Sequence, residues 1–147
     1  MDIAILVTEL SKPEYASMTD QQAADAVNAK TVAVRVLVPN WQMKQHAILG
    51  GYWPLVKAGQ LDSDPQKAGL CLSVIDWIDD PKISNTDMDL AGVQTMIAGL
   101  VAFGLITQSQ ANELDALADS TVRWVDSVGI GTVGDGHVVS AREIIGA

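Results

Sequence analysis

The chain of 147 residues is poor in the residue types that most often build a chemical site. Its single cysteine, Cys71, cannot form an internal disulfide, and it lies in an apolar run, so we expect a buried free thiol. The two histidines, His46 and His137, are far apart, and neither stands beside a cysteine or carboxylate pattern typical of zinc ligation. Both are expected on the surface or at a helix cap. The sequence therefore predicts no metal site and no cofactor.

Basic residues and long apolar runs are also scarce. Nine Lys and Arg face 18 Asp and Glu, for a formal net charge of −9, and the cations are scattered singly along the chain. Direct binding to nucleic acid, which needs clustered cations, is not expected. The longest apolar run, Met96–Ile106, is shorter than the about 20 residues needed to span a bilayer. Asp2 and Glu9 near the N-terminus argue against a secretory signal peptide, so we expect a soluble protein without membrane contact.

Acidic residues are concentrated between Asp62 and Asp89, which suggests calcium binding as one hypothesis. The stretch from Asn85 resembles the start of an EF-hand loop, but its glycine comes two residues late, at Gly92, and Met96 replaces the bidentate glutamate. We therefore assign these carboxylates to helix ends and solvated turns. The glycines of residues 129–136 lack a following P-loop lysine and are expected to permit tight bends. No catalytic residue is assigned, and no enzyme is expected.

Apolar periodicity and capping residues predict a mostly helical chain. Thr19 with Gln22 and Thr107 with Gln110 form capping boxes, and Asn40, Asp64 and Asp135 are suitable N-caps. Helix 64–78 should be mostly buried, helix 87–103 should form the bundle centre, and Gly104 should end it in a left-handed conformation. The predicted helices span residues 2–11, 19–30, 40–49, 52–58, 64–78, 87–103, 107–118, 120–128 and 136–145.

One segment has the pattern of a strand. From Thr31 to Val38, valines alternate with other residues in the period of two. A lone strand leaves its backbone groups unpaired, so three arrangements are open. The segment is an extended connector packed on the domain, it pairs within the fold, or it pairs with a neighbouring subunit by β-augmentation.

These features predict one domain, residues 1–147, with a mostly α fold: an irregular helical bundle with one extended or β arm. The expected parts are the N-terminal helices (1–30), the arm (31–38), the helical core (40–118) and a C-terminal segment (120–147).

Tryptophan supplies three of the candidate interface anchors, because it is enriched at protein interfaces as well as in cores. Trp77 is expected in the core, whereas Trp41 and Trp53 flank a glycine pair that interrupts the helical pattern. The candidate interface residues are Val32, Val34, Val36, Val38, Trp41, Trp53 and Trp124.

Two segments resemble small helical virion proteins encoded in the structural gene clusters of tailed bacteriophages. The first is the run from Tyr15 through Asp20 to Ala23, Ala24, Val27 and Asn28. The second runs from Ser120 through Trp124 and Gly129 to Val133, then Gly136, His137, Val138, Ala141 and Arg142. Trp124 and Val125 depart from the charged helix residues more usual there. The resemblance implies a component of the capsid, head-to-tail junction or tail.

The sequence thus predicts a non-enzymatic virion assembly protein that is made in the host cytoplasm and contacts other virion proteins and copies of itself. The alternative is an acidic intracellular adaptor or inhibitor of a basic protein, which the net charge of −9 supports.

Overall fold

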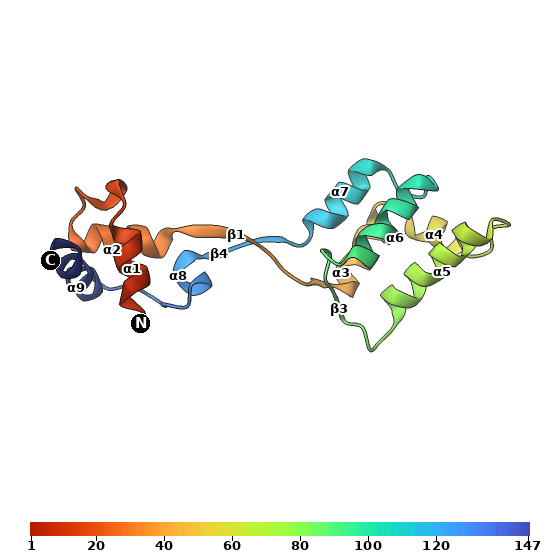
Figure 1. Ribbon diagram of the computed structural model, residues 1–147. Coiled ribbons are helices and arrows are strands. Elements are labelled where there is room, and N and C mark those ends of the chain that lie inside the picture. The colour runs from red at the N-terminus through yellow and green to blue at the C-terminus, as the bar shows by residue number, and fades with distance from the viewer. The chain divides into compact units, whose positions relative to one another are not determined.

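The computed structural model describes residues 1–147 and contains nine α-helices, one short 3-10 helix and two two-stranded sheets (Figure 1). This confirms the mostly helical fold with a β arm. The chain forms two compact units: unit 1 is Met1–Val34 with Ser120–Ala147, and unit 2 is Arg35–Asp119. Each unit has its own hydrophobic cluster, a division that the prediction of one domain from chain length did not include.

Unit 1 packs helices from both ends of the chain around Leu6, Val27, Val125 and Val138, which are fully buried. The C-terminal helix contacts the first two helices. The capping box at Thr19 is present as predicted. The helical elements of unit 1 are α1 (Ile3–Leu10), the 3-10 helix (Pro13–Tyr15), α2 (Asp20–Ala29), α8 (Trp124–Ser127) and α9 (Asp135–Gly146).

The predicted strand pairs within its own chain. β1 (Thr31–Arg35) lies beside β4 (Asp119–Arg123). The N–H of Trp124 donates to the carbonyl of Lys30, and the N–H of Val36 donates to that of Ala118. These two bonds are equally spaced on both strands and run in opposite chain directions, so the pairing is antiparallel without a bulge. The remainder of the segment forms β2 (Val38–Pro39), which pairs with β3 (Asn85–Thr86).

Two predictions for the C-terminal segment are wrong. Residues 120–123 belong to β4 rather than to a helix, because hydrogen bonding to β1 overrides the weak local helical pattern, and only Trp124–Ser127 is helical. The last helix begins at Asp135, and its capping side chain is His137, whose Nδ1 accepts the N–H of Gly134 at 3.0 Å. Asp135 therefore does not cap it.

Unit 2 is a helical unit whose core includes Val56, Cys71, Met88 and Leu100. The helices α6 (Ala91–Ala102) and α7 (Gln108–Ala116) form a hairpin, with Gly104 in the left-handed region (φ +71°) and the capping box at Thr107, as predicted. The helices of unit 2 are α3 (Asn40–Leu49), α4 (Trp53–Gly59), α5 (Pro65–Asp79), α6 (Ala91–Ala102) and α7 (Gln108–Ala116). No helix in the chain has the length and apolarity that crossing a bilayer requires.

Three expectations for unit 2 fail. Cys71 is the only fully buried residue of α5, so this helix is much less covered than predicted. Helix α6 begins at Ala91, because Asp87 turns the chain first by accepting the N–H of Asp89. Asn40 is the first residue of α3 and does not cap it, since its side chain bonds to distant backbone groups.

Candidate functional site

Exposed apolar side chains gather where the chain enters α3. Leu37 is 58% exposed and Trp41 66%, whereas Val38 and Asn40 between them are buried. Val38 and Asn40 point into the core, Pro39 between them is half-buried, and Trp41 lies in the first turn of α3. Leu37 and Trp41 are therefore exposed on either side of the half-buried Pro39, and we call these three residues the entry strip.

A polar network fixes the buried side of the entry strip. The Asn40 amide donates to the carbonyls of Trp77 (3.0 Å) and Ile83 (2.8 Å) and accepts from the Thr86 hydroxyl (2.6 Å). The indole N–H of Trp77 donates to the same hydroxyl oxygen at 2.8 Å. The partners of Asn40 come from α5, β3 and the turn between them. These hydrogen bonds therefore fix the position of the backbone that carries the entry strip.

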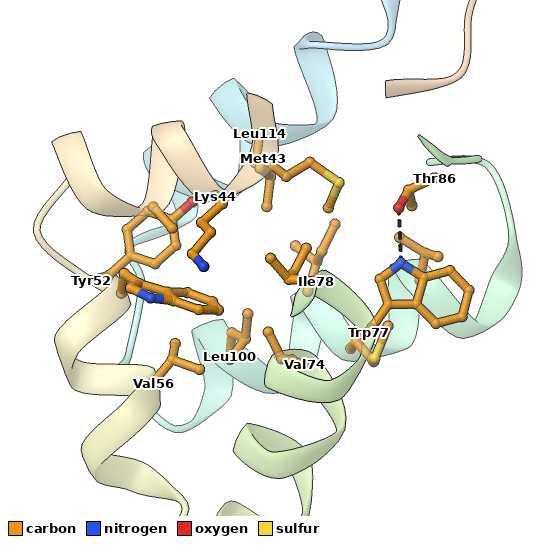
Figure 2. A pocket seen from close by; sticks show the side chains of 15 residues that line it. Met43, Lys44, Tyr52, Val56, Val74, Trp77, Ile78, Thr86, Leu100 and Leu114 are labelled. Atoms are coloured by element: carbon orange, nitrogen blue, oxygen red, sulfur yellow. Dashed lines mark hydrogen bonds between the residues drawn. The ribbon is translucent and has the colours of Figure 1, made fainter. Parts of the chain in front are cut away.

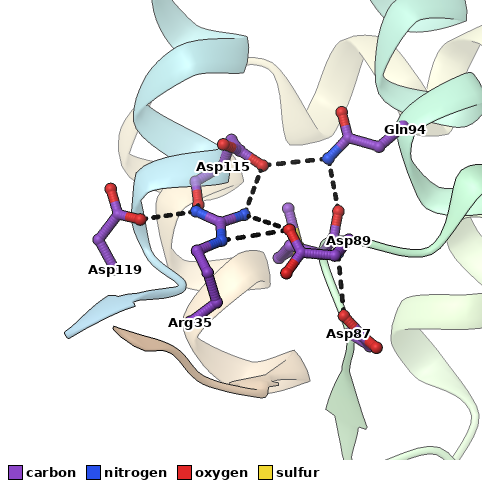
Figure 3. Close-up of polar contacts among 7 residues, drawn as sticks. Arg35, Asp87, Asp89, Gln94, Asp115 and Asp119 are labelled. Carbon is purple, nitrogen blue, oxygen red and sulfur yellow. Dashed lines mark hydrogen bonds and ion pairs between the residues drawn. The ribbon is translucent and has the colours of Figure 1, made fainter. Parts of the chain in front are cut away.

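Next to the entry strip, Arg35 binds three carboxylates (Figure 3). Its guanidinium lies 3.0 Å from Asp89, 2.9 Å from Asp115 and 2.7 Å from Asp119, and these hydrogen bonds raise the pKa of Arg35. Gln94 also donates to Asp115. Exposed ion pairs contribute little to stability singly, because water and salt screen them. Together they join the residue at which the chain enters unit 2 to the residue at which it leaves.

An apolar cavity of about 50 Å³ lies among α3, α4, α5 and α6, lined by side chains such as Met43, Val74 and Leu100 (Figure 2). At its edge the Lys44 ammonium stands 5.3 Å from the centre of the Trp53 ring and 2.7 Å from Asp79. For comparison, an engineered cavity of about 150 Å³ holds benzene. This cavity has room for little more than the end of one apolar side chain.

Tyr52 also borders the cavity and is held by His46, whose Nδ1 lies 2.7 Å from the Tyr52 hydroxyl. Burial, and then the charge of Glu113, raise the pKa of Tyr52 to about 12. The phenol therefore keeps its proton at neutral pH. His46 also lies 3.3 Å from Glu113, so the pair links α3 to α7.

In unit 1, Glu9 is a buried carboxylate with three donors. It accepts from the Tyr15 hydroxyl at 2.7 Å, from Lys30 at 2.6 Å and from Lys12. Burial by itself would raise the pKa of Glu9, but the hydrogen bonds from the two lysines and Tyr15 outweigh it and lower the pKa to about 2. Both oxygens of the Glu9 carboxylate accept hydrogen bonds, so the geometry indicates a structural network.

Hydrogen bonds join segments near the two ends of the chain inside unit 1. The Asn28 side chain donates to the carbonyl of Val133 and accepts its N–H, both at 2.8 Å. Arg142 on α9 donates to Asp20 and to the carbonyls of Tyr15 and Met18. The bonded residues come from segments 15–28 and 120–142, so both segments belong to one folded unit.

The structure separates the predicted interface residues into three groups. Val38 and Trp53 are in the core, at 1% and 6% exposure, and offer no surface to a partner. Val32, Val34 and Trp124 are half-buried, and the Lys30 ammonium lies 5.3 Å from the centre of the Trp124 ring. Only Val36 and Trp41 are exposed, and they lie at or beside the entry strip.

Sequence reasoning missed Leu37 and Pro39, because it assigned the alternating valines to the exposed face. The inward position of Val38 carried the signal, since its neighbours must then point outward. The expected buried thiol is confirmed: Cys71 is free and fully buried, and burial raises its pKa. No group of three or more His, Cys, Asp or Glu side chains is arranged to hold a metal ion.

Comparison of the chain with protein-family models, curated proteins and solved structures finds no match.

Proposed function

We propose that this chain is a non-enzymatic structural component of a tailed-phage virion, in the capsid, the head-to-tail junction or the tail, and that it acts through protein contacts. The observation that carries the proposal is the entry strip, where Leu37 and Trp41 are held exposed on a fixed base. Tryptophan is enriched among the residues that anchor protein interfaces.

The resemblance of two segments to virion proteins supports the location. These segments are separated by most of the chain, yet they meet through Asn28 with Val133 and through Arg142 with Asp20. The resemblance therefore concerns a folded unit rather than two isolated stretches. Partners would be other virion proteins and further copies of this chain, with head-to-tail contacts that close into a ring.

β1 pairs with β4 of the same chain, so the β-augmentation to a neighbouring subunit that the sequence left open is not the contact that we propose. Deleting residues 31–38 would remove half of a sheet and the buried Val38, so loss of assembly would only report misfolding. The contact surface is instead the entry strip, which can be altered without touching the core.

The proposal is tested by a double variant, Leu37→Ser with Trp41→Ser, supplied to assembling particles in place of the original chain. We expect it to fold normally and to be depleted from purified particles at least about tenfold, because it lacks its anchors. Leu61→Ser, at a residue 85% exposed and outside the strip, is the matched control and should be incorporated fully. Equal incorporation of both variants would contradict the role of the strip.

The alternative function, an acidic adaptor or inhibitor of a basic protein, is favoured by carboxylates without an ion pair in unit 2, such as Asp76, Asp80 and Asp87. Binding carried by such exposed charges should weaken steeply as ionic strength rises, whereas an apolar contact through the entry strip should persist. The salt dependence of partner binding distinguishes the two.

A further inference from the structure

Helices α5 and α6 leave an apolar groove open on unit 2. Its lining consists of Trp77, Leu90, Ala91, Gly92, Val93 and Met96, which we call the α5/α6 groove. Leu90 is 49% exposed, and Trp77 and Met96 are only partly buried. Gly92 is exposed, with no atom within 4 Å of where a Cβ would stand, so a partner backbone can approach closely at that point.

The groove and the interior cavity share part of their lining. Trp77, Val93 and Met96 line both of them, and Figure 2 shows Trp77 at one side of the cavity. The arrangement is that of a helix-binding groove, in which apolar residues of one helix face insert between two receptor helices.

Charge around the groove specifies the partner. Residues 76–90, which join α5 to α6, contain five aspartates and a single cation, Lys82. The nearby Lys44 and Arg35 already pair with Asp79 and Asp89. Two copies of this chain meeting through the groove would bring like charges together, which disfavours self-association. A helix with lysines or arginines beside its apolar face would complement both the apolar groove and the aspartates of residues 76–90.

We propose that the α5/α6 groove binds an amphipathic helix of another protein, with its apolar side chains in the groove and its cations beside the surrounding aspartates. This goes beyond the virion role and does not depend on it, because the groove and the entry strip comprise different residues.

The experiment uses the full chain and a synthetic peptide helix of about five turns, with leucines on one face and lysines on the other. A second peptide has glutamate in place of every lysine. Binding is measured by titration calorimetry at physiological salt. We expect the Leu/Lys peptide to bind with a dissociation constant in the micromolar range and the Leu/Glu peptide not to bind.

Two variants distinguish the groove from general attraction to an acidic protein. Leu90→Ser should weaken binding about tenfold, because the leucine lines the groove. Leu72→Ser, at a residue of equal exposure (49%) that does not line it, should bind as the original chain does. Absence of binding, or equal binding by both variants, would overturn the proposal. So would a dimer of the chain that Leu90→Ser abolishes, because the groove would then be a self-interface.

Discussion

Glu9 illustrates how a charged residue becomes part of a core. It is 3% exposed, yet its hydrogen bonds to Tyr15, Lys12 and Lys30 stabilise the charged form more than burial destabilises it. Unit 1 therefore contains an ionised carboxylate whose removal would leave the buried Tyr15 hydroxyl without a partner.

This gives a pH-dependent prediction. The folded-state pKa of Glu9 lies at about 2, below its ordinary 4.5, so its contribution to stability is complete above about pH 4.5 and is lost as the pH falls towards 2. We expect Glu9→Gln to destabilise unit 1 by about 2 kcal/mol at neutral pH and to flatten the loss of stability between pH 4.5 and pH 2. Hydrogen exchange of α1 and α2 amides measures this effect.

Glu14→Gln is the control, because Glu14 is exposed and makes no ion pair. It should leave the pH profile of unit 1 nearly unchanged. If both variants had the same profile, Glu9 would not be the group that links acid pH to unfolding.

Gly59 marks the closest approach of α4 to α5. A Cβ at this position would lie 2.5 Å from the Sγ of Cys71. We expect Gly59→Ala to destabilise unit 2 by about 1–3 kcal/mol, because a buried sulfur cannot move aside freely. Gly69→Ala, on an open face of α5, should instead stabilise it by up to about 1 kcal/mol. Denaturant unfolding followed by circular dichroism compares them, and similar effects of both substitutions would contradict this packing.

Some of these residue roles were visible in the sequence. The capping boxes at Thr19 and Thr107 depend on neighbours three positions away, and an apolar run is sufficient to predict a buried Cys71. The sequence did not show that Trp41 is exposed and Trp53 is buried, because both side chains are large and apolar. Their exposure depends on how the chain crosses the core.

At the scale of elements, the period of two predicted β1, but not its partner. An alternating pattern indicates which face of a strand is buried, but it does not indicate which segment forms hydrogen bonds with the strand. Residues 120–123 of β4 were predicted as the start of a helix, because only contact with β1 favours their extended form. Nonlocal pairing of this kind cannot be read from a local pattern.

The pairing predicts protection of two backbone amides. The N–H groups of Val36 and Trp124 donate to Ala118 and Lys30 across the two strands. We expect both to exchange more slowly than the amide of an unbonded loop residue in the isolated chain, though faster than the core of α6, because a two-stranded sheet is marginally stable. Hydrogen exchange by NMR measures this. Protection that develops only after assembly would show that the strand is free in the monomer.

The helices α5 and α6 were predicted with correct type and approximate position, but with too much burial. Their composition indicates apolar surroundings, and composition does not distinguish a neighbouring helix of the same chain from a partner protein. Trp77, Leu90 and Met96 are incompletely covered apolar residues that line the α5/α6 groove, whereas Leu72 is exposed outside it.

At the scale of the whole molecule, the division into two units follows from contacts between distant segments. Residues 1–34 and 120–147 share one hydrophobic cluster, and residues 35–119 contain the other. A chain of this length is expected to form one domain whether its buried residues make one hydrophobic cluster or two. The sequence alone therefore did not indicate the division into two units.

Separate cores predict separate folding. We expect a fragment of residues 35–119 to fold by itself and to unfold cooperatively, since the ion pair of Arg35 with Asp119 joins its two ends. Circular dichroism and thermal unfolding of the fragment measure this. A fragment that is disordered while the full chain is folded would show that unit 2 depends on unit 1.

We propose that this chain is built into a virion and acts there through protein contacts. Quantitative mass spectrometry of repeatedly purified virions tests this proposal. We expect peptides of both units at a copy number that stays constant, relative to the major capsid and tail proteins, through successive purification steps. A chain that is abundant in the infected-cell lysate but disappears from the virions during purification would contradict the proposal.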